Sequence, residues 1–259
     1  MSNYPLGDGV APYIPEQSRD IRHMGIRQVE QAHWLAPHPA AEHYLANKTQ
    51  QRICLGDKVH ACIEGYEPSL VTVVRYMLDH LAKVHRRSVA ITADEPLDAF
   101  WQLSLACIED ICVIDLSAAQ PMFVAGSLCA PTLWRLEEKL GTSLLALHQP
   151  VPAYADMLGR QVDQFFLRLK PGRVFQRYNY GLSKSEALCQ RQPSEGCFEF
   201  WRTEQQSLVR VPNSDLALFT IRVQVHHHTQ LTEAQWQQVQ GMMAAQPEDI
   251  RRYKGMATD

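Results

Sequence analysis

The sequence predicts an α+β protein built on an antiparallel sheet of about five strands, with helices covering one face. Three observations lead to this fold class. Two short strand-like segments come first, a run of helical segments follows, and three more strand-like segments come after the helices. Grouped strands with helices inserted between the groups are typical of α+β proteins, whereas alternating βαβ units would predict a parallel sheet.

The segments before the first strands are predicted to be an arm and two helices. Prolines at positions 5, 12 and 15 predict an extended arm over residues 1–21, either lying across the protein or loose. Residues 22–259 are expected to form a single domain with additional N- and C-terminal helices. Pro68 suits a first helical turn, and apolar residues recur at helical spacing over residues 68–84, which predicts an amphipathic helix. A shorter helix is predicted over residues 96–106.

The strand-like segments are rich in Val, Ile and Phe. Residues 111–116 and 122–129, separated by a polar break that ends in Pro121, predict a hairpin. Three later strands are predicted over residues 173–180, 198–211 and 216–225. In the last of these, alternation places Arg222 on the face opposite an unbroken apolar row. That row consists of Ala217, Phe219, Ile221, Val223 and Val225.

A helical insertion separates the two groups of strands. Its predicted helices span residues 133–140, 143–147 and 154–169, and a last helix over residues 232–245 follows the sheet with Thr232 as its N-cap. The grouping of two strands, an insertion and three strands resembles the layout of PAS-type domains. A likeness of fold carries only associational weight for function.

Composition excludes several classes of function. The chain has 259 residues, 46% hydrophobic and 20% charged, as in ordinary globular proteins, and its net charge of -3 provides no field that would attract nucleic acid. No apolar run approaches the ~20 residues that span a membrane, and the N-terminus lacks the pattern of a secretory signal. The seven cysteines show no CxxC spacing. We therefore expect a cytoplasmic protein with reduced thiols and neither membrane nor nucleic-acid partners.

His148 is the candidate metal ligand. It lies at the end of a short apolar helical segment, just before Pro150 and Pro152, and it is the one histidine between His85 and His226. A neutral imidazole beside an apolar surface could be the axial ligand of a haem iron. A histidine that caps the carbonyl groups of its own helix is the alternative for an arbitrary protein.

Other polar residues are weaker candidates. Tyr178 and Glu204 could supply a proton donor and a counter-ion for an amine, and Arg222 could pair with a haem propionate or another anion. Each of them could equally be an ordinary surface or strand residue. Cys129 is a weaker candidate for a thiolate ligand, and the cluster at residues 226–228 is best explained as a solvated strand end. The sequence has no P-loop, dinucleotide fingerprint, nucleophile elbow or HExxH motif.

A series of segments resembles one known family, that of haem-dependent oxidative N-demethylase α subunits. The segments are MGIR (24–27) with Trp34, EDICVI (109–114), FVAGSLCAP (123–131) with Trp134, KLGTSLLALHQPVPAY (139–154), QRYNY (176–180), RTEQQSLVRVP (202–212), FTIR (219–222) and RYKG (252–255). They follow the order of the family and cover nearly the whole chain after the first ~20 residues.

The resemblance implies haem b bound in a PAS-like fold, with O2 and a small secondary amine such as dimethylamine as substrates. Electrons would come from NADPH through a separate reductase carrying FMN and a 2Fe-2S cluster, and a folate-binding subunit could take up formaldehyde. His148 falls on the family's histidine in HxPVPxY. Glu204, Gln206 and Arg222 also match the family pattern and are implied to contact the pocket or the propionates.

The chain departs from the family pattern near these residues. It reads RYNY where relatives read RxNW, EQQSLVRVP where they read ERQTLRRLP, and FTIRVQ where they read FTIRTY. The loss of an arginine and an aromatic residue puts the amine specificity in doubt. Two other functions therefore stay open: a haem or small-molecule binding module such as a gas sensor, and a diverged structural subunit without haem.

Overall fold

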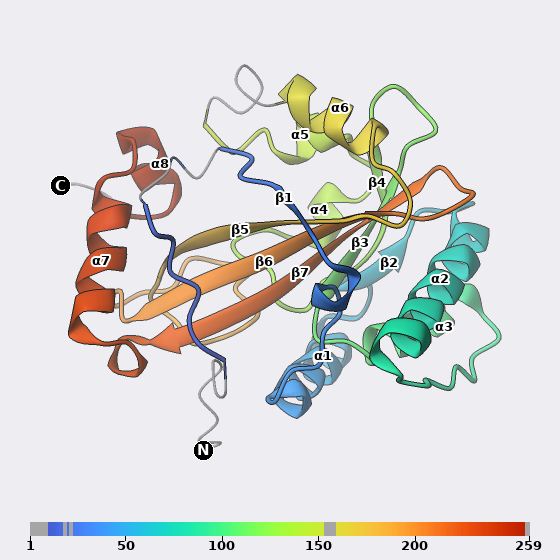
Figure 1. Cartoon of the computed structure of the whole chain (residues 1–259), viewed down its shortest axis with the longest axis horizontal. Helices are drawn as coiled ribbons and strands as arrows, with labels where there is room; N and C mark the ends of the chain where they lie inside the picture. Colours follow the sequence, from blue (N-terminus) through green and yellow to red (C-terminus); the bar gives the residue numbers. More distant parts are fainter. Residues whose placement is uncertain (1–9, 18–19, 21–22, 153–158, 257–259) are drawn as a thin grey trace.

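An antiparallel sheet lies at the centre of the computed structural model, which describes residues 10–17, 20, 23–152 and 159–256 (Figure 1). In these residues the sheet has seven strands in the order β1-β5-β6-β7-β3-β4-β2. The strands are β1 (Arg27–Val29), β2 (His60–Cys62), β3 (Asp110–Asp115), β4 (Met122–Ser127), β5 (Val174–Ser183), β6 (Phe200–Arg210) and β7 (Leu216–His227). The α+β class is confirmed.

The strand count of about five is wrong. All five predicted strands are present as β3 to β7, and β1 and β2 are added at the two edges. Each edge strand has three residues. Such a segment is too short to show the alternation by which a strand is recognised in a sequence.

Eight α-helices surround the sheet in the described residues. They are α1 (Ala41–Leu55), α2 (Glu67–His85), α3 (Pro96–Ser104), α4 (Leu136–Lys139), α5 (Leu144–Leu147), α6 (Arg160–Leu167), α7 (Glu233–Ala244) and α8 (Glu248–Tyr253). The predictions of α2, α3 and α7 are confirmed, and Thr232 caps α7 by accepting from Gln235 N. The helix predicted over residues 154–169 is found as α6, and residues 153–158 lie outside the described residues.

Helices cover both faces of the sheet, so the expectation that one face is covered is wrong. On one face, Val209 belongs to a core cluster with α2 and α3, and Trp201 packs against α7. On the other face, Leu208 packs with Leu144 and Phe166 of the helical insertion. Because the strands are buried on both faces, a charged side chain within them needs an opposite charge or hydrogen-bond partners. The charged residues of these strands therefore indicate where polar sites lie.

The described part of the N-terminal arm, residues 10–17, crosses the sheet on the side of α7 (Figure 1). The Tyr13 carbonyl accepts from Trp201 Nε1 at 2.8 Å, and the Val10 carbonyl bonds His226 Nε2 at 3.2 Å. We call this side the arm face; its side chains include Gln176, Tyr178, Trp201, Thr203, Gln205, Arg222, Gln224 and His226. The opposite side, the insertion face, carries Phe175, Arg177, Asn179, Arg202, Glu204, Gln206 and Leu208.

Gly126 in β4 lies where the insertion packs closely on the sheet. A Cβ atom there would come within 2.8 Å of Phe123 Cζ and 2.9 Å of the Leu128 and Leu136 Cδ1 atoms. We expect Gly126→Ala to lower the free energy of unfolding by about 1–3 kcal/mol through overpacking. The matched control is Gly241→Ala in α7, where no atom lies within 4 Å. Urea unfolding should show this control unchanged or stabilised by up to about 1 kcal/mol; equal effects of the two substitutions would contradict the packing argument.

Candidate functional site

Charged and polar side chains occupy the insertion face of β5 and β6. Arg202, Glu204 and Gln206 alternate along β6 and are 3%, 8% and 9% exposed. Strand pairing places Asn179 opposite Glu204 and Arg177 opposite Gln206. Because side chains directly opposite each other in an antiparallel pair lie on the same face, these five form one polar group, in which Arg177 and Asn179 are half-buried.

Glu204 is the centre of this group. Its Oε1 atom accepts a hydrogen bond from Thr132 Oγ1 at 2.5 Å, and Oε2 accepts from Asn179 Nδ2 at 3.1 Å and Gln206 Nε2 at 2.8 Å. Burial alone would raise the pKa of this carboxyl group, but Arg202, the Thr132 hydroxyl and Lys254 together hold the pKa below its usual value. Glu204 is therefore a buried carboxylate that stays ionised.

Arg202 anchors this group to the neighbouring loops. Its Nε atom donates to Thr132 Oγ1 at 2.8 Å, so Thr132 links Arg202 to Glu204. The rest of the guanidinium donates to backbone carbonyls of Ala130, Ala187 and Leu188 at 2.9–3.1 Å. These carbonyls belong to the segments that follow β4 and β5. Sequence analysis did not select Arg202, although its position two residues before Glu204 in a strand was the available signal.

His148 lies at the C-terminal end of α5, as predicted. Its Nδ1 atom is 2.8 Å from the Leu144 carbonyl, and because a carbonyl oxygen can only accept, Nδ1 carries the proton. This is the bond of a helix cap, and it also fixes the tautomer whose lone pair is on Nε2, as in metal-ligating histidines. Burial lowers the pKa of His148 to about 4, with a smaller contribution from Arg177. The imidazole is thus neutral at physiological pH.

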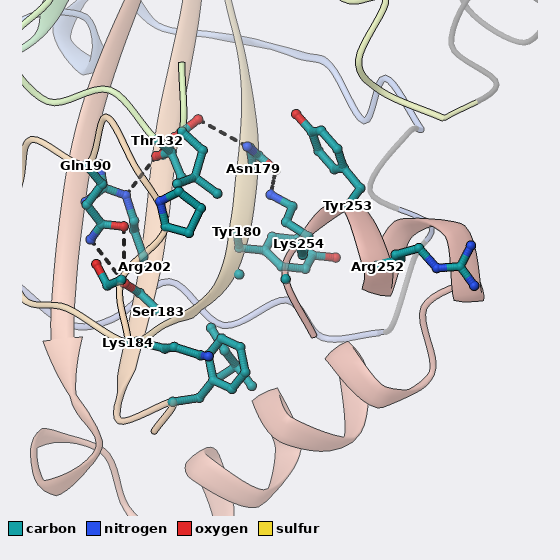
Figure 2. Close-up of a pocket in the computed structure, with 18 residues that line it drawn as sticks. Thr132, Asn179, Tyr180, Ser183, Lys184, Gln190, Arg202, Arg252, Tyr253 and Lys254 are labelled. Carbon is teal, nitrogen blue, oxygen red and sulfur yellow. Dashed lines mark hydrogen bonds between the residues drawn. The ribbon is translucent and has the colours of Figure 1, made fainter. Parts of the chain in front are cut away.

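Lys254 reaches the same face from the end of α8 (Figure 2). Its Nζ atom lies 3.4 Å from Asn179 Oδ1. Burial lowers the pKa of Lys254, Glu204 raises it, and Arg177 lowers it. Arg177 also lowers the pKa of His148, so its positive charge acts on both groups. The segment RYKG had been noted in the sequence without a role for its lysine.

Tyr178 and Arg222 do not join this group, because both lie on the arm face. The Tyr178 ring stacks on Tyr13 with centroids 3.6 Å apart and planes 7° apart. Arg222 forms an ion pair with Glu109, in which Nε donates to Oε1 at 2.8 Å, and Nη2 donates to the Ala36 carbonyl at 2.5 Å. The sheet therefore separates these two predicted site residues from His148, Glu204 and Gln206.

The remaining sequence candidates are also buried. Burial raises the pKa of Cys129 to about 12, so the residue is a thiol and not a thiolate at neutral pH. His226 is 2% exposed beneath the arm, so describing it as part of a solvated strand end is wrong. No group of three or more His, Cys, Asp or Glu side chains that could hold a metal ion occurs in the described residues.

Fold and geometry together define an α+β protein with a buried site of mixed charge between a sheet and a helical insertion. The chain belongs to the family described as haem-dependent oxidative N-demethylase, alpha subunit-like, whose match covers residues 25–258. That description names haem, oxidative N-demethylation and a subunit of a larger assembly. A comparison with curated proteins found no match. Among the described helices, none is long and apolar enough to cross a membrane.

The surroundings of His148 fit a haem group in their chemistry. The neutral imidazole is a suitable donor, since a histidine nitrogen is a common axial ligand of haem iron. Leu144 and Leu147 of α5, Phe165 of α6 and Phe175 of the insertion face belong to one apolar cluster, and such side chains suit contact with a porphyrin. Arg177 supplies a cation of the kind that pairs with propionates.

Proposed function

We propose that this protein is the oxygenase component of a multi-subunit amine demethylase. In the overall reaction, a small secondary amine with an N-methyl group, O2, NADPH and H⁺ give the demethylated amine, formaldehyde, NADP⁺ and water; dimethylamine would give methylamine. The observation that carries the proposal is the ionised, buried carboxylate of Glu204 on the sheet face against which α5, the helix that ends at His148, packs. Family membership adds the dependence on haem.

His148 would hold haem b through its Nε2 atom. When bound, the haem iron supplies the activation of O2. Arg177 would pair with a propionate. Its positive charge lowers the pKa of both His148 and Lys254. The hydrogen bond from Nδ1 to the Leu144 carbonyl would keep the imidazole in one orientation.

Glu204 would bind the substrate amine, which is a cation at neutral pH. A carboxylate has about four lone-pair positions, and three are used by Thr132, Asn179 and Gln206, so one remains for an N–H group. The three donors fix the carboxylate in place before the amine arrives. Gln206 thus acts by positioning Glu204, while Tyr178 and Arg222 lie outside this arrangement on the arm face.

The fold is consistent with a PAS-like core. Strands β3 and β4 pair with each other, the insertion follows, and β5, β6 and β7 form a meander whose last strand pairs with β3. We propose that residues 22–259 form one such domain with additional edge strands and helices, working in the cytoplasm. A partner reductase with FMN and a 2Fe-2S cluster would deliver electrons from NADPH, and a folate-binding partner would take up formaldehyde.

An absorption spectrum after haem reconstitution, followed by a formaldehyde assay with a matched reductase, tests this function. We expect a Soret band and one formaldehyde per NADPH consumed. Glu204→Gln preserves the shape of the side chain and removes its charge, so it should retain the Soret band and lose kcat/KM by roughly 100-fold or more. Absence of a Soret band would exclude the haem proposal, and a haem protein that releases no formaldehyde from any secondary amine would be a sensor instead.

A further inference from the structure

A cavity of about 280 Å³ adjoins Glu204 at the end of the insertion face nearest α8 (Figure 2). It is lined by the second half of β5, by Arg202 and Glu204 of β6, by Thr132, and by residues 252–255. This volume is near the lower end of ligand pockets in proteins, which begin at roughly 300 Å³. The cavity therefore suits a small molecule of a few heavy atoms.

Positive charge predominates around the cavity. Among the described residues that line it, Lys184, Arg202, Arg252 and Lys254 are basic, and Glu204 is the one acidic residue. Arg202 is already bonded to Thr132 and to backbone carbonyls. The Arg252 side chain is 76% exposed, bonds Glu248 at 2.8 Å, and points away from the cavity in Figure 2. Lys184 Nζ lies over the Phe198 ring.

Lys254 has unused donors and lies beside Asn179, the partner of Glu204. Its ammonium group has three N–H bonds, and its one hydrogen bond to a described residue is the long contact of 3.4 Å with Asn179 Oδ1. Gly181 opposite leaves space beside it, since a Cβ atom there would be 3.8 Å from Nζ. A buried ammonium with spare donors beside a cavity is suited to an anionic oxygen of a ligand.

Lys254 and Glu204 are separated by one amide group. Asn179 accepts from Lys254 through Oδ1 and donates to Glu204 through Nδ2 at 3.1 Å. The two opposite charges therefore lie about one small polar group apart along the cavity. An α-amino acid has its amine and its carboxylate separated by one carbon, so it can reach both partners at once.

We propose that the cavity binds N-methylated α-amino acids, with the secondary amine at Glu204 and the carboxylate at Lys254. The N-methyl part rests on the proposed demethylase function, while the carboxylate part rests on the charges of the cavity alone. The specificity of the site is thus for a carboxylated amine over a simple dialkylamine. Lys254 is the residue that makes this selection.

Calorimetric titration of the haem-reconstituted protein tests the proposal with two amines that have the same number of non-hydrogen atoms. N-methylglycine carries the carboxylate, and N-methylisobutylamine has an isopropyl group in its place. We expect N-methylglycine to bind at least about tenfold more tightly, because a charge-assisted hydrogen bond is lost in the other ligand. Lys254→Met should abolish the preference, Lys254→Arg should retain part of it, and the matched control Arg252→Met should leave it unchanged.

Two results would overturn the inference: equal affinity of the wild-type protein for the two amines, or an undiminished preference in a folded Lys254→Met variant. The comparison of the two amines on the wild-type protein tests the inference even if the Lys254→Met variant does not fold. The Soret band and the formaldehyde assay distinguish failure of the proposed function from failure of the carboxylate site. A protein without a Soret band that still prefers N-methylglycine loses the haem proposal and keeps the carboxylate site. A protein that demethylates dimethylamine and shows no preference loses only the carboxylate site.

Discussion

We expect His148→Ala to lose the Soret band of the reconstituted protein, or to bind haem so weakly that dilution removes it. His148 is neutral at physiological pH, its pKa being about 4, and its Nδ1 proton is held by the Leu144 carbonyl. Removing an outer partner of a metal ligand costs roughly 10–100-fold in affinity, and removing the ligand itself should cost more. Haem titration followed at the Soret maximum measures the loss directly.

The control for this substitution is His33→Ala, which removes an exposed histidine on the side of the protein away from the insertion. It should leave haem affinity unchanged. Added imidazole should restore the spectrum of His148→Ala, because the ligand can then enter the space that the side chain vacates. A full, unshifted Soret band in His148→Ala would show that another residue holds the iron.

Sequence patterning predicted the elements that carry a clear local signal and missed β1, β2 and α1, which carry none. The helices α2 and α3 are clearly amphipathic, and the N-cap Thr232 marks the start of α7. In contrast, α1 presents two buried side chains, Tyr44 and Lys48, of which Lys48 donates to three backbone carbonyls. A helix held by a buried lysine has no apolar stripe to recognise. Tertiary contacts, not local pattern, fix such an element.

The candidate site could be predicted from the sequence only in part. The family resemblance implied that Glu204 and Gln206 contact a pocket, and the structure has the two side chains bonded to each other on one face of β6. Pairing between strands was not visible in a single sequence, so Tyr178 was grouped with Glu204 although its neighbour Asn179 is the residue opposite Glu204. Arg222 was expected to face a ligand because its strand was assumed to have one buried face. Both faces are buried, and Glu109 neutralises Arg222.

Arg202→Met is expected to lower the free energy of unfolding by about 3–5 kcal/mol, the largest effect on stability that we predict. Methionine retains much of the volume of the side chain and removes every donor. The carbonyls of Ala130, Ala187 and Leu188 then lose a partner, and Glu204 loses its principal counter-ion. Removing one of two opposite buried charges is costly because the remaining charge loses its compensation. Urea unfolding at pH 7 measures the change.

The control is Arg252→Met, on a side chain that is 76% exposed and pairs with Glu248 at i,i+4 spacing. Such surface pairs contribute about 0.3–0.5 kcal/mol, so the control should unfold nearly as the wild-type protein does. If both substitutions lowered the free energy of unfolding equally, Arg202 would contribute no more to stability than an exposed arginine does. That result would contradict the buried network around Glu204.

The pH dependence of stability gives an independent test of the same network. Burial opposes ionisation of Glu204, yet Arg202 and the Thr132 hydroxyl keep its folded pKa below the ordinary 4.5. The folded state therefore binds fewer protons than the unfolded state near pH 4.5, and this stabilisation is complete above that pH and lost as pH falls through the folded pKa. In Arg202→Met, burial prevails and the pKa of Glu204 rises. The folded state of this variant then binds more protons than the unfolded state near pH 4.5, so acidification should destabilise it less than it destabilises the wild-type protein. An unchanged stability difference between the two proteins across this pH range would show that Arg202 does not hold the charge of Glu204.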